Sequence, residues 1–249
     1  LNETPVMFTA RQTAELIKYA ANAFLATKIT FINEIANLCE QVDANVQDVA
    51  RGIGLDGRIG AKFLHAGPGY GGSCFPKDTL ALLRTAEGLN LPMNIVKATV
   101  EVNDQRKRDM AQKVIDACGG SLAGKTIAVL GLTFKPNTDD MRDSPSLDII
   151  PALLAAGAEV RAHDPEGMDE ARGMLTGIEF CDDAYATLAD ADALAIITEW
   201  NAYRALDLPR VKDLMKAPVM IDMRNIYDPA NMREQGFSYF SIGRPAVQP

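Results

Sequence analysis

The sequence contains few of the residues that build metal, haem or disulfide sites. It has two histidines, His65 and His163, and four cysteines with no Cys-x-x-Cys pair among them. Zinc and haem sites are usually built from such residues at short spacing, so we expect no metal centre. Four cysteines in 249 residues also fit a reducing, cytoplasmic compartment, in which a thiol remains available for chemistry.

The sequence also lacks the signals of membrane and nucleic-acid-binding proteins. No uncharged run approaches the roughly 20 residues of a membrane-spanning helix, and no signal peptide is recognisable. Asp and Glu number 33 against 25 Lys and Arg, which gives a formal net charge of −8. This acidic balance disfavours nucleic acid or an anionic membrane as the main partner, although local basic clusters could still bind phosphate groups.

What is present is the composition of a globular protein, 47% hydrophobic and 23% charged, long enough for two domains or one large one. The first part is mainly helical in pattern. A capping box at Thr9–Gln12 predicts the start of a long helix that ends at about Gln41. Between Lys18 and Lys28 this helix carries no charge, so we expect it to be buried on most faces, in the core or against a second copy of the protein.

After Lys125 the pattern changes to short apolar runs that alternate with helical stretches. Such runs are typical of buried parallel strands. We therefore predict an α/β protein, with a helical domain over residues 1–118 and a doubly wound, Rossmann-like parallel-sheet domain over residues 119–249.

The densest motif is a glycine-rich segment from Gly67 to Asp78 that contains one cysteine. Gly67, Gly69 and Gly72 formally satisfy G-x-G-x-x-G. A dinucleotide fingerprint follows a strand, however, whereas the flanks here are helical in pattern. We interpret the segment as a loop whose backbone N–H groups approach a ligand closely.

Cys74 lies within this segment, just before a helix that Pro76 is expected to begin, and close to Lys77. A helix N-terminus and a neighbouring lysine both favour the thiolate form. A free cysteine is most often a small buried hydrophobe. The surrounding loop, proline and lysine favour a nucleophile here instead.

Other polar residues stand where ligands are usually bound. Lys18 and Asn22 share one face of an otherwise apolar helix, which indicates a polar pocket or, alternatively, a lysine that reaches the solvent. Lys135, Arg142 and Arg224 follow apolar strands, at the sheet edge where doubly wound domains bind ligands. Solvated loop charges are the alternative interpretation for these three residues.

Three segments resemble, in the same order, the UDP-glucose/GDP-mannose dehydrogenase family: Glu15–Phe24, Phe63–Asp78 and Gly131–Lys135. The resemblance extends over essentially the whole chain and implies a central helical dimerisation domain followed by a UDP-binding domain. Members of the family also carry an N-terminal NAD domain. We expect this chain to begin just after that domain, so that the main NAD site lies outside it.

The family oxidises C6 of the sugar in a nucleotide sugar, in two NAD-dependent steps. By resemblance, Cys74 is the nucleophile that forms a thiohemiacetal and then a thioester. Lys18 and Asn22 would stabilise the developing alkoxide, and Asp78 would handle the hydrolytic water.

The resemblance also implies the binding residues. Contacts with the UDP-sugar would come from Lys18, Asn22, Arg58, Phe63, Leu64, His65, Ala66, Gly67, Gly71, Phe134, Lys135 and Arg224. Arg58 would serve the site of a neighbouring subunit, which implies a homodimer through the central helices. Lys77 and Arg142 would contact NAD.

UDP-glucose is the substrate that the segment Tyr70–Asp78 favours within this family. A sister activity on GDP-mannose or UDP-N-acetylmannosamine is the alternative. A non-catalytic UDP-sugar-binding or dimerisation module would remain if no NAD domain preceded Leu1.

Overall fold

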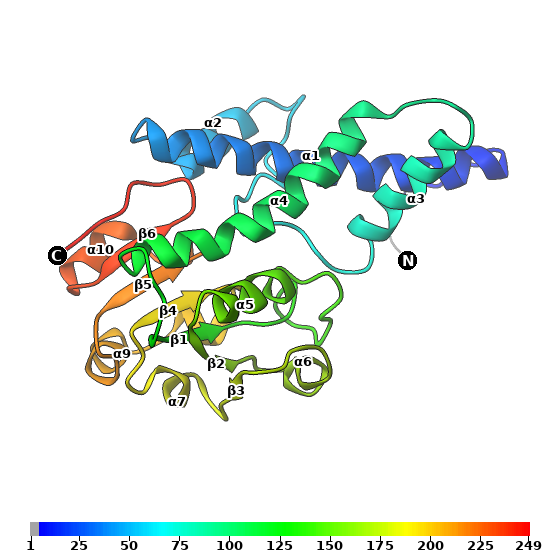
Figure 1. Cartoon of the computed structure of the whole chain (residues 1–249). Helices are drawn as coiled ribbons and strands as arrows, with labels where there is room; N and C mark the ends of the chain where they lie inside the picture. Colours follow the sequence, from blue (N-terminus) through cyan, green and yellow to red (C-terminus); the bar gives the residue numbers. More distant parts are fainter. Residues whose placement is uncertain (1–4) are drawn as a thin grey trace.

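The computed structural model describes residues 5–249 and consists of a helical half and a sheet half (Figure 1). The helical half contains α1 (Arg11–Gln41), α2 (Val46–Gly54), α3 (Phe75–Glu87) and α4 (Asn94–Ala117). Helix α1 begins after Ala10, which makes no side-chain capping bond, so the predicted capping box is wrong. No helix within residues 5–249 is both long enough and apolar enough to cross a membrane.

The sheet half contains six strands in the order β3-β2-β1-β4-β5-β6, and every neighbouring pair is parallel. The strands are β1 (Thr126–Leu130), β2 (Glu159–His163), β3 (Glu179–Phe180), β4 (Ala193–Ile196), β5 (Val219–Asp222) and β6 (Ser238–Ser241). The helices between them are α5 (Ser146–Ala155), α6 (Met168–Met174), α7 (Ala184–Leu188), α8 (Asn201–Arg204), α9 (Leu208–Leu214) and α10 (Pro229–Glu234). This doubly wound topology confirms the predicted fold class.

One hydrophobic core joins the two halves. Ile127 and Val129 of β1 pack in the same cluster as Ile32 of α1 and Val114 of α4. The alternate residue Leu130 belongs to a second cluster, on the other face of the sheet. Helix α4 contacts both α1 and α5 and therefore connects the halves (Figure 1).

Helix α1 is buried along one face only. Its opposite face carries a stripe of large apolar side chains at seven-residue spacing, 45–65% exposed: Ile17, Phe24, Phe31 and Leu38. The expectation that this helix is buried on most faces therefore fails within a single chain. One face of the helix lies in the core of this chain, whereas the face that carries the stripe does not.

The segment after β6 returns to the helical half. The carbonyl oxygen of Gly243 accepts a hydrogen bond from Val46 N at 2.8 Å. Gly243 N donates to Glu40 Oε1 at 2.7 Å. A Cβ atom at position 243 would lie 2.6 Å from a methyl group of Val46, so glycine is required for this close approach.

His163 ends β2 and is partly buried against Tyr203. Its Nδ1 lies 3.0 Å from the Tyr203 hydroxyl oxygen. Burial lowers the pKa of His163 below the ordinary value of 6.5, although the charge of Asp164 opposes this shift. The unfolded chain therefore binds a proton more readily than the folded chain. The stability that His163 contributes is complete above pH 6.5 and is lost as the pH falls through the lowered pKa.

We expect the free energy of unfolding to fall more steeply between about pH 7 and pH 5 in the wild type than in His163→Asn. Urea denaturation at each pH measures both slopes. Equal slopes would assign the acid sensitivity to other groups.

Candidate nucleotide site

A cavity of about 710 Å³ lies between the glycine-rich loop of the helical half and the carboxyl ends of β1, β4 and β5. Many of the residues predicted for the site line it: Phe63, His65, Gly67, Gly71, Cys74, Phe134, Lys135 and Arg224. The strand order reverses between β1 and β4, so the cavity opens at the switch point where such sheets bind ligands. Its volume is within the range of small-molecule sites.

Buried side chains of α1 and α4 hold the glycine-rich loop by its backbone. Asn33 Oδ1 accepts from Gly67 N at 2.8 Å, and Arg106 Nε donates to Gly67 O at 3.0 Å. Asn103 accepts from Tyr70 N at 2.8 Å and donates to Tyr70 O at 3.2 Å. The loop is therefore fixed by the two longest helices, which leaves its other side to form the cavity wall.

Two glycines allow this loop to contact the sheet half. A Cβ atom at Gly71 would lie 2.2 Å from the carbonyl oxygen of Asp143. Gly72 N donates to Arg142 O at 2.8 Å. Gly72 has a φ of +80°, and a Cβ atom there would lie 2.7 Å from the ring of Phe134. The close contact between the glycine-rich loop and the sheet half therefore requires glycine at positions 71 and 72.

We expect Gly72→Ala to lower the free energy of unfolding by about 2–4 kcal/mol, because it adds a left-handed backbone strain to a clash with an aromatic ring. Chemical denaturation measures the loss. Gly52→Ala is the control, because Gly52 lies in α2 with no atom within 4 Å of its Cβ position. That variant should be stabilised by about 0.5–1 kcal/mol. Equal effects at the two positions would contradict this account.

Cys74 is the N-cap residue of α3 and is exposed, with Pro76 in the first turn of the helix, as the sequence predicts. Its Sγ lies 3.8 Å from Ser73 Oγ. All four cysteines are free, and Cys39 and Cys181 are buried. The thiol of Cys74 is thus at the positive end of a helix dipole and open to the cavity.

Asp78 lies one helical turn beyond Cys74, and its side chain is 3% exposed. Asn22 Nδ2 donates to Asp78 Oδ2 at 2.5 Å, and Lys18 Nζ lies 4.0 Å from the same oxygen. Lys77 donates to the other oxygen. Three of the predicted catalytic residues, Lys18, Asn22 and Asp78, are therefore neighbours, and the fourth, Cys74, receives a backbone hydrogen bond from Asp78 N at 2.9 Å.

Two opposing effects set the pKa of Asp78. Burial raises it, but hydrogen bonds from Lys77 and Asn22 and the positive charges of Lys77 and Lys18 outweigh burial and lower the pKa below its usual value. Lys18 itself is 62% exposed at its side chain. The side chain of Lys18 is therefore largely in contact with solvent, while its ammonium group also lies near Asp78.

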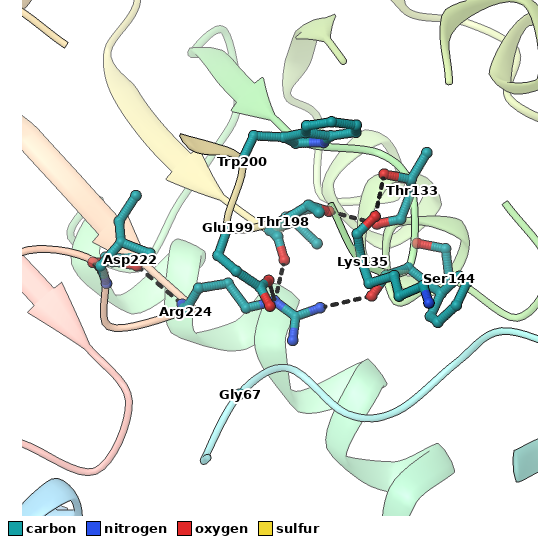
Figure 2. A network of polar contacts seen from close by, with 12 residues as sticks. Gly67, Thr133, Lys135, Ser144, Thr198, Glu199, Trp200, Asp222 and Arg224 are labelled. Atoms are coloured by element: carbon teal, nitrogen blue, oxygen red, sulfur yellow. Dashed lines mark hydrogen bonds and ion pairs between the residues drawn. The ribbon is translucent and has the colours of Figure 1, made fainter. Parts of the chain in front are cut away.

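Arg224 is fixed on the sheet side of the cavity (Figure 2). Its Nε donates to Ile197 O at 2.6 Å, and one terminal nitrogen donates to Phe134 O at 3.1 Å. Its backbone N–H donates to Asp222 Oδ1 at 3.0 Å. Glu199 Oε2 lies 3.0 Å from Arg224 Nε. These contacts hold the guanidinium at the cavity wall.

A buried carboxylate holds the loop that carries Phe134 and Lys135. Asp164 is 1% exposed. Its oxygens accept from Leu132 N, Thr133 N, Thr133 Oγ1, Trp200 Nε1, Glu166 N and Gly167 N, at 2.7–3.1 Å. In dinucleotide-binding sheets an acid in this region accepts a hydrogen bond from the ribose. Here those acceptors are all engaged, so the sheet edge does not fit NAD in that manner.

The predicted NAD contacts lie outside the cavity lining. The Lys77 and Arg142 side chains are 68% and 64% exposed, and both lie close enough to influence Cys74 by charge. Arg142 also pairs with Asp140 at 2.8 Å. Their chemistry fits an anionic ligand that approaches the thiol from outside.

Five predicted substrate residues do not line this cavity: Lys18, Asn22, Arg58, Leu64 and Ala66. Lys18 and Asn22 lie beside Asp78 instead. Arg58 is 90% exposed at its side chain and pairs with Asp56 at 2.6 Å. Leu64 and Ala66 instead line a second cavity of about 420 Å³, which shares His65 and Arg224 with the first. Within residues 5–249, no group of three or more His, Cys, Asp or Glu side chains is placed to hold a metal ion.

The sequence reasoning missed Lys62, Asp140 and Glu199, which also line the first cavity. A signal for Glu199 was present, since it follows a predicted strand in the same way that Arg224 does.

The sheet is Rossmann-like, and its switch point faces a cysteine-bearing cavity, which is the usual ligand position in this class of fold. The model for the central domain of the UDP-glucose/GDP-mannose dehydrogenase family matches residues 12–105. The model for the UDP-binding domain of the same family matches residues 128–229. The chain belongs to this family.

The chain is 64% identical to the UDP-glucose 6-dehydrogenase of Rhizobium meliloti (strain 1021), over 98% of the chain and 56% of that relative. Its fold resembles a UDP-glucose dehydrogenase from Pyrobaculum islandicum, with a TM-score of 0.83, 40% identity, and coverage of 90% of this chain and 50% of that one. It also resembles an NDP-N-acetyl-D-galactosaminuronic acid dehydrogenase from Methanosarcina mazei Go1, with a TM-score of 0.85, 31% identity, and coverage of 95% and 52%. The chain thus spans about half the length of its relatives.

Proposed function

We propose that this chain supplies the nucleophile and the UDP-sugar site for the NAD-dependent oxidation of UDP-glucose to UDP-glucuronate. The observation that carries the proposal is an exposed thiol, Cys74, in a cavity that also contains Lys135 and Arg224. The thiol suits attack on a carbonyl carbon, and the two cations suit a diphosphate. The identity of 64% to a named UDP-glucose 6-dehydrogenase supports this substrate.

The substrate would lie with its glucose at Cys74 and its diphosphate near Lys135 and Arg224. NAD, when bound, supplies the acceptor for the hydride that leaves C6 in each of the two oxidations. After the first oxidation C6 is an aldehyde carbon. Cys74 Sγ adds to this carbon, and the carbonyl oxygen takes up negative charge. Lys18 and Asn22, which contact Asp78 one helical turn beyond Cys74, would stabilise this charge.

The thiohemiacetal formed on Cys74 loses the second hydride and becomes a thioester. Water then attacks C6, the C–S bond breaks, and the electron pair returns to sulfur as a thiolate. Asp78, whose lowered pKa keeps it ionised, accepts a proton from the attacking water. In total the alcohol group takes up one water molecule and gives up two hydrides to NAD and three protons as it becomes a carboxylate.

We also propose a homodimer that covers the apolar stripe of α1. The stripe residues lie at seven-residue spacing, which is the spacing of helix-pairing interfaces: Ile17, Phe24, Phe31 and Leu38. Arg58, outside the cavity of its own chain, would then reach the site of the partner.

Four free cysteines support a reducing, cytoplasmic compartment.

Calorimetric titration with UDP-glucose, GDP-mannose and UDP-N-acetylmannosamine tests the proposed substrate. We expect UDP-glucose to bind most tightly. Tighter binding of GDP-mannose or UDP-N-acetylmannosamine would show that the proposed substrate is wrong and would favour one of these sister activities. If none of the three nucleotide sugars bound, the proposed site would be refuted.

A further inference from the structure

Glu199 and Asp140 are acidic residues in the lining of a cavity that also contains three basic side chains. Glu199 lies three residues after the end of β4, near Lys135 and Arg224 (Figure 2). Lys62 completes the basic part of the cavity lining. The side chain of Glu199 is 30% exposed. A carboxylate repels a diphosphate, so its presence requires a reason other than phosphate binding.

Glu199 forms an ion pair with Arg224, and one of its carboxylate oxygens accepts no hydrogen bond among residues 5–249. Its Oε2 lies 3.0 Å from Arg224 Nε, but that N–H donates to Ile197 O at 2.6 Å. Among residues 5–249, Glu199 Oε2 is buried and has no hydrogen-bond partner. An ionised carboxylate has room for about four hydrogen bonds, and leaving a buried acceptor unsatisfied is costly.

The position of Glu199 selects the part of the ligand that it meets. A sugar carbon must reach Cys74, which belongs to the helical half, whereas Glu199 belongs to the domain that matches the family's UDP-binding model. The ligand must therefore extend from the thiol towards the sheet. The sugar and the nucleoside both carry neutral donors, whereas the diphosphate carries none. With the sugar at Cys74, the nucleoside is left to meet Glu199, through ribose hydroxyl groups or a base N–H.

We propose that Glu199 is a specificity-determining residue that accepts a hydrogen bond from an O–H or N–H donor of the nucleoside. This inference rests on the proposed function, because it assumes a nucleotide-sugar ligand. The contact would let the site recognise the nucleoside, while Arg224 and Lys135 recognise the diphosphate.

Titration of UDP into Glu199→Leu and Glu199→Gln tests the contact. We expect the leucine variant, which has no acceptor, to bind UDP about tenfold more weakly or worse than the wild type. The glutamine variant keeps one neutral acceptor and should lose less. Glu179→Leu is the matched control, because Glu179 also pairs with an arginine, Arg161 at 3.0 Å, but lies on β3 away from the cavity. It should bind UDP as the wild type does.

Analogues identify the donor and exclude an indirect effect. We titrate 2′-deoxy-UDP, 3′-deoxy-UDP and N3-methyl-UDP into the wild type and into Glu199→Leu. The analogue that lacks the donor should bind the wild type about tenfold more weakly and should be unaffected by the substitution. Inorganic diphosphate should bind both proteins equally, or the variant more tightly. If the substitution weakened diphosphate as much as UDP, Glu199 would act only by placing Arg224, and the proposal would be wrong.

Failure of the inference can be told from failure of the proposed function. If the wild type does not bind UDP, the proposed function fails. If the wild type binds UDP and Glu199→Leu binds it equally well, only the role of Glu199 fails. Should the leucine variant not fold, the glutamine variant and the analogues on the wild type decide, because undiminished binding of all three analogues would overturn the contact.

Discussion

Cys74→Ser should abolish formation of the carboxylate by the complete polypeptide, with a loss of about 10⁴-fold or more. Serine has nearly the same shape, so the cavity should keep its form. Its hydroxyl, however, is a weak nucleophile without a general base to activate it, whereas a thiol is intrinsically reactive. The site needs this reactivity because C6 must pass through a covalent intermediate before its second oxidation.

Two measurements on this variant separate chemistry from binding. Reduction of NAD in the presence of UDP-glucose reports turnover, and calorimetry reports the affinity for UDP-glucose, which should remain within about twofold of the wild type. Cys118→Ser is the matched control, since Cys118 is also a free thiol but does not line the cavity, and it should turn over normally. Normal turnover by Cys74→Ser would show that Cys74 is not the nucleophile.

Asp164→Ala should lower the free energy of unfolding by about 3–5 kcal/mol. The substitution removes both acceptor oxygens and leaves several buried N–H groups without partners, among them those of Leu132, Thr133 and Trp200. Asp164→Asn keeps one acceptor oxygen and should lose less. Because the same carboxylate holds the loop that carries Lys135, UDP should also bind more weakly.

Chemical denaturation and calorimetry measure these two effects. Asp183→Ala is the control, because Asp183 also accepts two backbone N–H groups, from Tyr185 and Ala186, but does so at an exposed helix N-terminus. Loss of that cap should cost about 1 kcal/mol and leave UDP binding unchanged. A cost at Asp164 no larger than at Asp183 would show that the buried network is not a main support of the sheet edge.

The sequence was informative wherever the local pattern determines the structure. Continuous apolar runs predicted β1, β4 and β5, and Pro76 predicted that α3 begins beside Cys74. Strand β3 has only two residues and carries no pattern of its own, so it was missed.

Most of the rest depends on contacts between distant residues. Asn33 and Asn103 hold the glycine-rich loop, but each lies more than 30 positions from the residue that it binds, and nothing in the local sequence indicates the partner. The exposed stripe on α1 likewise depends on where α3 and α4 pack, which the pattern of α1 alone does not fix.

The contact between Gly243 and the α1–α2 region has a consequence for synthesis on the ribosome. Gly243, which bonds to both Glu40 and Val46, lies 203 positions after Glu40 and is therefore made much later. The turn after α1 must therefore wait until nearly the whole sheet half has been translated before it gains these hydrogen bonds. Contacts so far apart along the chain slow folding, and until they form the apolar groups beneath them stay open to chaperones and to other nascent chains.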